Sequence, residues 1–208
     1  MMSVSRPPRR AFISLLSCVA AGGLLAACSS SSAVTNYDLT APRQVRAGSS
    51  AVGQIAVAEP SAVQPLETDK IIVKETSGAV SSLGGGQWAD RLPRLIQSRL
   101  IQTFENSSGL KAVSRPGDRV TPDFQLNSEL RAFQIDAATG QAVVGMSAKL
   151  VNDRSGRIAT TRVFTARVPV GTINAANAAQ ALDRALSIVL LDIVRYVGTG
   201  RSTAAPST

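Results

Sequence analysis

Two long segments of the chain carry apolar residues at three- and four-residue spacing, which predicts amphipathic helices. The first covers residues 88–104, with Asp90 as its expected N-cap and Pro93 in its first turn, where a missing N–H is tolerated. The second follows an expected N-cap at Asn174. Its apolar stripe, which we expect to be buried on a sheet, comprises Ala178, Leu182, Ala185, Leu186, Val189, Ile193 and Val197.

Short apolar segments before and after the first helix are typical of strands. Residues 54–58 carry branched side chains at alternate positions and are followed by Glu59-Pro60, where a strand would stop. Residues 70–74 are rich in β-branched side chains and bounded by charge. Residues 110–113 are a third, brief strand candidate. Residues 81–86 are glycine- and serine-rich and predict a loop.

Three longer strands are predicted over residues 124–135, 143–151 and 157–168. In the first of them the apolar phase slips by one residue between Leu130 and Phe133, which indicates a β-bulge. Sequential strands joined by short turns pair antiparallel, and two amphipathic helices can cover one face of such a sheet. The predicted fold is therefore a two-layer α+β domain with a mainly antiparallel sheet.

The N-terminal segment has the pattern of a bacterial lipoprotein signal. Residues 1–10 are a basic stretch, and residues 11–27 carry no charge and are too short to span a bilayer comfortably, which takes about 20 apolar residues. The sequence Leu25-Ala26-Ala27-Cys28 resembles the lipobox. We therefore expect cleavage between Ala27 and Cys28 and a lipid on the Cys28 thiol. An ordinary signal peptide containing a chance cysteine is the alternative, and export by the general or the twin-arginine route stays open.

These signals divide the chain into four parts. Residues 1–27 are the signal peptide, which is removed, and residues 28–50 are the lipidated N-terminus and a flexible tether. Residues 51–198 form the α+β domain, and residues 199–208 are a disordered tail. Tyr37-Asp38-Leu39 is the exception within the tether, since this stretch could dock on the domain.

The charge of the mature chain is mild. Removal of Arg6, Arg9 and Arg10 with the signal reduces the 22 basic residues to 19, against 14 acidic residues, which leaves a net charge of +5. Such a charge suits a protein that faces anionic membranes, and it equally suits ordinary solubility. The basic residues are scattered and aromatic residues are scarce, so we expect no binding to nucleic acid.

Histidine and cysteine, which serve in many catalytic and metal sites, are absent or nearly absent from the chain. The chain has no histidine, and its two cysteines are Cys18, within the signal, and Cys28. This excludes disulfides, thiolate metal ligands and catalysis by Ser–His–Asp or Cys–His groups in the mature domain. Asp123, Glu129 and Asp136 lack the spacing of a known carboxylate pair and are expected to be solvated. We expect no enzyme activity, no metal site and no cofactor except the diacylglycerol and N-acyl chain on Cys28.

Two further features have competing interpretations. The glycines of residues 81–86 precede a helix, as phosphate-binding loops do, but neither nucleotide-binding spacing is met, so a flexible loop is the favoured interpretation. Trp88, the single tryptophan, is a candidate partner contact. As the first apolar residue of a helix stripe, it is more commonly a core or lid residue.

The order of the predicted strands and helices over residues 36–197 resembles that of a known family. The segments that carry the resemblance are Tyr37-Asp38-Leu39, residues 55–57 and 65–73, residues 88–93, the hairpin at 148–164 and the alanine-rich residues 174–190. Together they resemble the auxiliary lipoproteins of ABC transport systems that accompany MCE-domain lipid transporters in Gram-negative bacteria. One departure is Gly84-Gly85-Gly86-Gln87, where the family usually carries an aromatic residue and an arginine.

The resemblance implies a non-catalytic periplasmic subunit that works with an ABC permease and an MCE-domain protein, on phospholipid or another hydrophobic cargo. The alternative is an outer-membrane lipoprotein that binds and regulates a cell-wall synthase or an envelope-assembly complex. Ser29 is not the aspartate that retains enteric lipoproteins at the inner membrane, which favours the outer membrane. Cargo, direction of transport and a homo-oligomeric state stay open.

Overall fold

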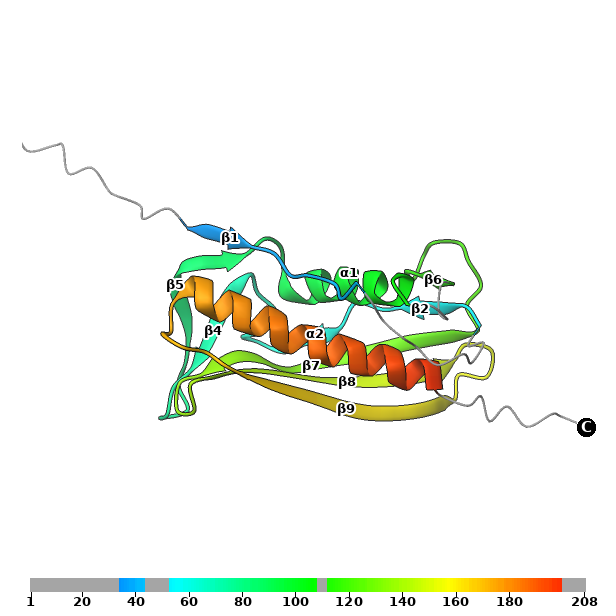
Figure 1. Ribbon diagram of the computed structural model, residues 1–208. Coiled ribbons are helices and arrows are strands. Elements are labelled where there is room, and N and C mark those ends of the chain that lie inside the picture. The colour runs from blue at the N-terminus through cyan, green and yellow to red at the C-terminus, as the bar shows by residue number, and fades with distance from the viewer. Residues whose placement is uncertain (1–33, 44–52, 108–111, 200–208) are drawn as a thin grey trace, which may run out of the picture. The chain divides into compact units, whose positions relative to one another are not determined.

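The structure is a computed structural model that describes residues 34–43, 53–107 and 112–199 of the chain. The described residues form a nine-stranded sheet and two helices (Figure 1). The helices are α1 (Leu92–Glu105) and α2 (Ala175–Thr199). The strands are β1 (Thr35–Tyr37), β2 (Ile55–Val57), β3 (Ser61–Ala62), β4 (Lys70–Lys74), β5 (Val80–Trp88), β6 (Val113–Ser114), β7 (Phe124–Asp136), β8 (Gln141–Asn152) and β9 (Ile158–Pro169).

Strand β7 organises the sheet because its two edges pair with different partners. One edge pairs antiparallel with β8 along its whole length, and β8 pairs antiparallel with β9. The other edge pairs in parallel with β2, β3 and β4, which lie one after another along it. Strand β5 returns antiparallel on β4. The long antiparallel ladders confirm the predicted α+β class with a mainly antiparallel sheet.

The predicted bulge lies where the apolar phase slips. The register between β7 and β8 shifts between Leu130 and Ala132, so Leu130 and Phe133 are both buried although they are three residues apart. A second shift lies between β8 and β9, at the point where Val151 pairs with Ile158. The shift explains why Ile158 is exposed although it lies an even number of residues before the buried Phe164 and Ala166.

Helices α1 and α2 lie side by side on one face of the sheet (Figure 1). The predicted stripe of α2 is buried at every position, against β8, β9, β7, β5 and β4. The side chain of Asn174 accepts a hydrogen bond from the Asn177 backbone N–H at 2.9 Å, which is the expected N-cap. The helix continues to Thr199, one residue beyond the predicted end of the domain.

The segment before α1 differs from the prediction. Residues 81–86 belong to β5 rather than to a loop, and Trp88 ends that strand rather than starting the helix. The Trp88 N–H donates to the Asp69 carbonyl at 2.7 Å, which holds the chain extended through this point. Helix α1 then begins at Leu92 with Arg91, not Asp90, as its N-cap. Apolar spacing alone could not separate the end of a buried strand from the first turn of a helix.

Candidate functional site

The N-terminal described segment, residues 34–43, crosses both helices and is called the strap here (Figure 1). The strap lies in the region predicted as a flexible tether, so that prediction is wrong for these residues, whereas the docking of Tyr37-Asp38-Leu39 is confirmed. Within the strap, β1 pairs in parallel with residues 86–88 of β5. The folded domain therefore starts well before the expected boundary at residue 51.

Gly86 permits the close approach of the strap to the sheet. A Cβ at this position would lie 2.6 Å from the Tyr37 ring and 2.8 Å from the Ala175 Cβ. These distances are shorter than van der Waals contact, so any side chain would separate β1, β5 and the start of α2. The absence of a side chain at Gly86 is thus a packing requirement of this chain.

After β1, one carboxylate on the strap binds α1, and one carboxylate on α2 binds the strap. Asp38 accepts a hydrogen bond from the Arg99 guanidinium on α1 at 2.5 Å. Asp183 on α2 accepts from both the backbone N–H and the hydroxyl of Thr40, each at 2.7 Å. Between these two attachments the Leu39 side chain is 2% exposed and belongs to the core. The Asp38 and Thr40 attachments thus lie on either side of one buried apolar residue of the strap.

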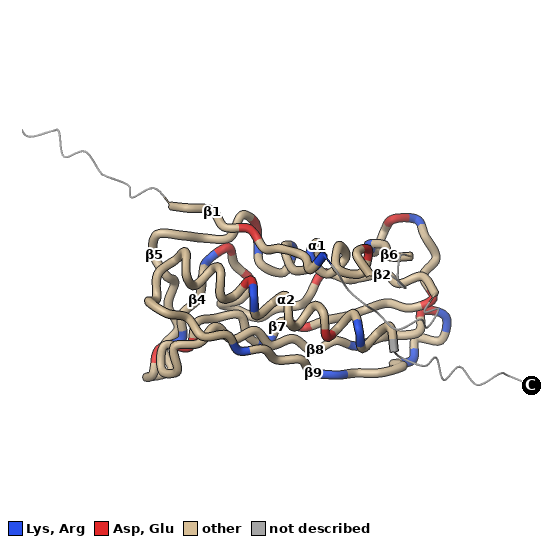
Figure 2. Tube along the Cα trace, in the orientation of Figure 1, with Lys and Arg blue, Asp and Glu red and all other residues tan. Residues whose placement is uncertain are grey.

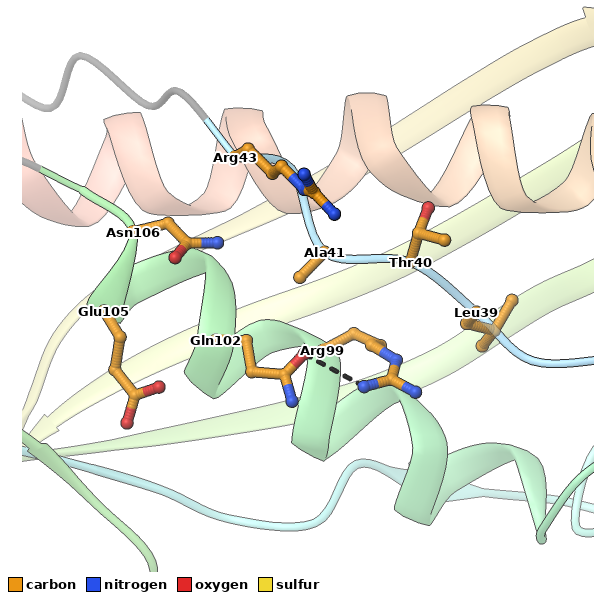
Figure 3. Close-up of a pocket in the computed structure, with 8 residues that line it drawn as sticks. All are labelled: Leu39, Thr40, Ala41, Arg43, Arg99, Gln102, Glu105 and Asn106. Carbon is orange, nitrogen blue, oxygen red and sulfur yellow. Dashed lines mark hydrogen bonds between the residues drawn. The ribbon is translucent and has the colours of Figure 1, made fainter.

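Beside the strap lies an open cavity of about 640 Å³, bounded by strap residues and the last turns of α1 (Figure 3). The Arg99 guanidinium donates to the Gln102 side chain at 2.9 Å, and the Asn106 side-chain amide donates to the Pro42 carbonyl at 2.9 Å. The lining residues are Leu39, Thr40, Ala41, Arg43, Arg99, Gln102, Glu105 and Asn106. The Arg99 guanidinium and the Asn106 amide are therefore already engaged in hydrogen bonds within the protein.

A prediction about the strap follows from its α2 attachment. Asp183→Ala removes the carboxylate that accepts both hydrogen bonds from Thr40. A hydrogen bond to a charged group contributes about 1.5–3 kcal/mol to stability, which is more than a bond between neutral groups contributes. We expect the amide of Thr40 to exchange about tenfold faster or more with deuterated solvent, since about 1.4 kcal/mol corresponds to a factor of ten. Asp192→Ala is the control, because Asp192 pairs with Arg195 on α2 itself. Unchanged exchange at Thr40 in the Asp183 variant would contradict the attachment.

Of the residues predicted from sequence, Ala27 and Cys28 lie outside the described residues. Trp88 is 1% exposed and packs edge-on against Phe133, with ring centroids 5.5 Å apart. Its side chain therefore belongs to the core, and the partner-contact interpretation is not supported by this position. The glycine-rich segment is part of β5 and does not precede a helix N-terminus, which removes the geometric basis of a phosphate site.

The three carboxylates expected to be solvated each have a hydrogen-bond or ion-pair partner. Asp123 accepts from the Gln54 N–H, Glu129 pairs with Arg131, and Asp136 accepts from the Ala138 N–H in the turn after β7. Across the part of the chain that the structure describes, no three acidic, cysteine or histidine side chains are placed to hold a metal ion.

The sequence did not predict the roles of Thr40, Arg99 and Asp183, because their partners lie far away along the chain.

Comparison of the sequence with known protein families identifies the family of this chain. The profile of the ABC-type transport auxiliary lipoprotein component matches residues 37–194, which start within the strap and stop within α2. The chain belongs to this family. The resemblance to auxiliary lipoproteins of ABC transport is thereby confirmed, and membership of this lipoprotein family implies a membrane-anchored location in the cell envelope. Over the described residues, no helix has the length and apolar character needed to cross a bilayer.

Similar proteins support the same assignment of fold for this auxiliary lipoprotein. An uncharacterized protein from Bradyrhizobium diazoefficiens is 31% identical over 166 residues, which are 77% of this chain and 44% of that protein. The chain thus spans less than half of that relative. A crystal structure of a Xanthomonas campestris protein superposes with a TM-score of 0.72 at 26% identity, covering 78% of this chain and 94% of that one. A second crystal structure, of an uncharacterized protein, shares the fold at 14% identity and a TM-score of 0.62, covering 79% of this chain and 98% of the other.

Proposed function

We propose that this auxiliary lipoprotein is a non-catalytic subunit of an MCE-type ABC transporter that moves phospholipid or another hydrophobic cargo across the envelope. The family match over residues 37–194 carries the proposal, since it covers most of the strap, the sheet and the two helices. The partners would be the MCE-domain protein and the ABC permease. Binding and placement, rather than catalysis, would be the contribution of the domain.

The proposal includes an anchor on Cys28. Cleavage after Ala27 would expose Cys28 to the diacylglycerol and N-acyl chain that hold the domain at a membrane, favoured as the periplasmic face of the outer membrane. Two acyl signals are needed for stable anchoring, because a single chain binds only marginally. Such an anchor raises the local concentration of the domain beside membrane partners without any new contact.

Affinity purification from detergent-solubilised membranes tests the partners. The bait is the full-length protein with a C-terminal tag, and a tagged lipoprotein of unrelated fold from the same membrane is the control. We expect enrichment of an MCE-domain protein and its permease over that control. Enrichment of neither would contradict the proposal, and enrichment of a cell-wall synthase would favour the alternative function.

Two measurements on the same material test the anchor. Mass spectrometry of the N-terminal peptide is expected to find Cys28 as the first residue, carrying acyl chains. Density-gradient separation of the membranes is expected to place the protein with the outer membrane. Recovery with the inner membrane would contradict the assignment of membrane while leaving the anchor intact.

A further inference from the structure

One end of the domain is built from segments that contain no charged residue. It comprises Val34 at the start of the strap, residues 76–85 in the β4–β5 hairpin, the β7–β8 turn at 137–140 and residues 170–174 before α2, and is called the uncharged end here. The sequence has no Asp, Glu, Lys or Arg in residues 34–37, 76–89, 137–148 or 168–182.

Backbone contacts show that these segments meet. The Ala137 N–H donates to the Lys74 carbonyl at 3.0 Å, which joins the β7–β8 turn to the base of the β4–β5 hairpin. The Val170 N–H donates to the Gly140 carbonyl at 2.8 Å, which joins the same turn to the segment before α2. The close approach of Ala175 to Gly86, opposite Thr35 in the sheet, completes the group.

The opposite end of the domain carries many charged residues. Its β8–β9 turn contains Asp153, Arg154 and Arg157, and the loop between β6 and β7 adds four more charged residues. Figure 2 shows charged residues in both of these loops, whereas the start of β1 and the bend of β5 are free of them. Near the uncharged end, charges occur at the base of the β4–β5 hairpin, where Lys74 lies opposite Asp136 and is followed by Glu75.

The uncharged end also exposes apolar side chains. Val34 is 52% exposed, Val80 is 46% exposed and Ile173 is 38% exposed. Bringing a charged side chain toward a bilayer costs far more desolvation energy than bringing an uncharged polar one, and apolar side chains favour the transfer. The composition of this end therefore suits contact with a membrane interface, and it gives no electrostatic attraction that would bind the free domain on its own.

The length of chain before the strap places this end near the membrane. Thr35, the first residue of β1, is seven positions after Cys28, and seven residues span at most about 25 Å when fully extended. Strand β9 has 12 residues and runs about 35 Å from the charged end to the uncharged end, at about 3.3 Å per residue. A lipid on Cys28 thus keeps the uncharged end, where β1 begins, within reach of the bilayer.

We propose that the uncharged end rests on the surface of the bilayer in which Cys28 is anchored, with the charged end directed away from the membrane. This inference depends on the proposed lipidation of Cys28. The tether supplies the local concentration, and the uncharged end determines which surface of the domain makes the contact. The charged end and the far ends of the two helices are then left accessible to transporter partners.

Ile173→Cys and Ile158→Cys form a matched pair for testing this orientation, because both positions are exposed isoleucines and they lie at opposite ends of the domain. With Cys28 lipidated, the introduced residue is the only free thiol of the mature protein and accepts a nitroxide label alone. The full lipidated protein is placed in vesicles of phosphatidylethanolamine and phosphatidylglycerol. We expect the label at 173 to be several-fold less accessible to a water-soluble nickel relaxant than the label at 158.

Equal accessibility of the two labels in protein that carries acyl chains on Cys28 would overturn the orientation and leave the proposed function intact. Protein that lacks acyl chains and fails to float with vesicles would overturn both the anchor and the orientation. Hydrogen exchange of the unsubstituted protein gives a second measurement. Vesicles are expected to slow exchange in residues 137–140 and not in 153–157, and the reverse pattern would also overturn the orientation.

Discussion

Replacing Trp88 with alanine is expected to lower the free energy of unfolding by about 3–5 kcal/mol, the range for a fully buried large aromatic residue. Trp88 is 1% exposed at the end of β5 and packs edge-on against Phe133. Its removal would leave a cavity in the core shared by the sheet and both helices. Urea denaturation followed by circular dichroism measures the change and does not depend on tryptophan fluorescence.

Trp88→Phe is the matched control, because it keeps an aromatic ring against Phe133 and removes the indole Nε1, which is buried without a hydrogen-bond partner among the described residues. We expect this variant to lose clearly less stability than Trp88→Ala. A small loss on Trp88→Ala, of about 0.5 kcal/mol as at ordinary surface positions, would mean that Trp88 is not a core residue.

Gly86→Ala is expected to cost about 1–3 kcal/mol, the usual range for overpacking a site without space. The added methyl group would meet the Tyr37 ring on the strap and the Ala175 side chain at the start of α2. Because Ala175 belongs to a long buried helix, relief would come mainly through displacement of the strap. Thermal unfolding measures the loss of stability, and proteolysis between residues 34 and 43 measures release of the strap.

Gly84→Ala provides the comparison within the same glycine run. Nothing lies within 4 Å of a Cβ built on Gly84, so we expect a change within about 0.5 kcal/mol and no increase in proteolysis of the strap. Equal destabilisation by the two substitutions would contradict the specific role given to Gly86, since it would point to a property of the glycine run as a whole.

The parts of the fold with strict periodicity were predictable. The stripe of α2, its Asn174 cap and the bulge after Leu130 follow from local spacing, because burial of one face imposes the period of the element on the sequence. The bounds of β4 were likewise predicted, since a run of β-branched residues with charge at both ends has few other conformations.

The parts built from long-range pairing were not predictable. Residues 81–86 have the composition of a loop, and they form a strand because β4 supplies backbone partners on one side and β1 pairs with the end of β5 on the other. The strap has no periodicity, and its docking depends on Arg99 and Asp183, which lie on separate helices. Nothing local to Thr40 indicates a partner so far away in the sequence.

The contact between Thr40 and Asp183 joins residues that are 143 positions apart, and this separation affects the order of folding. The N-terminal part of the domain is synthesised first, yet it cannot complete its contacts until α2 has been made. Long-range and parallel pairings of this kind slow folding and leave strand edges unpaired in the meantime. The domain is therefore expected to fold only after nearly the whole chain has been released, and to need chaperone protection during that interval.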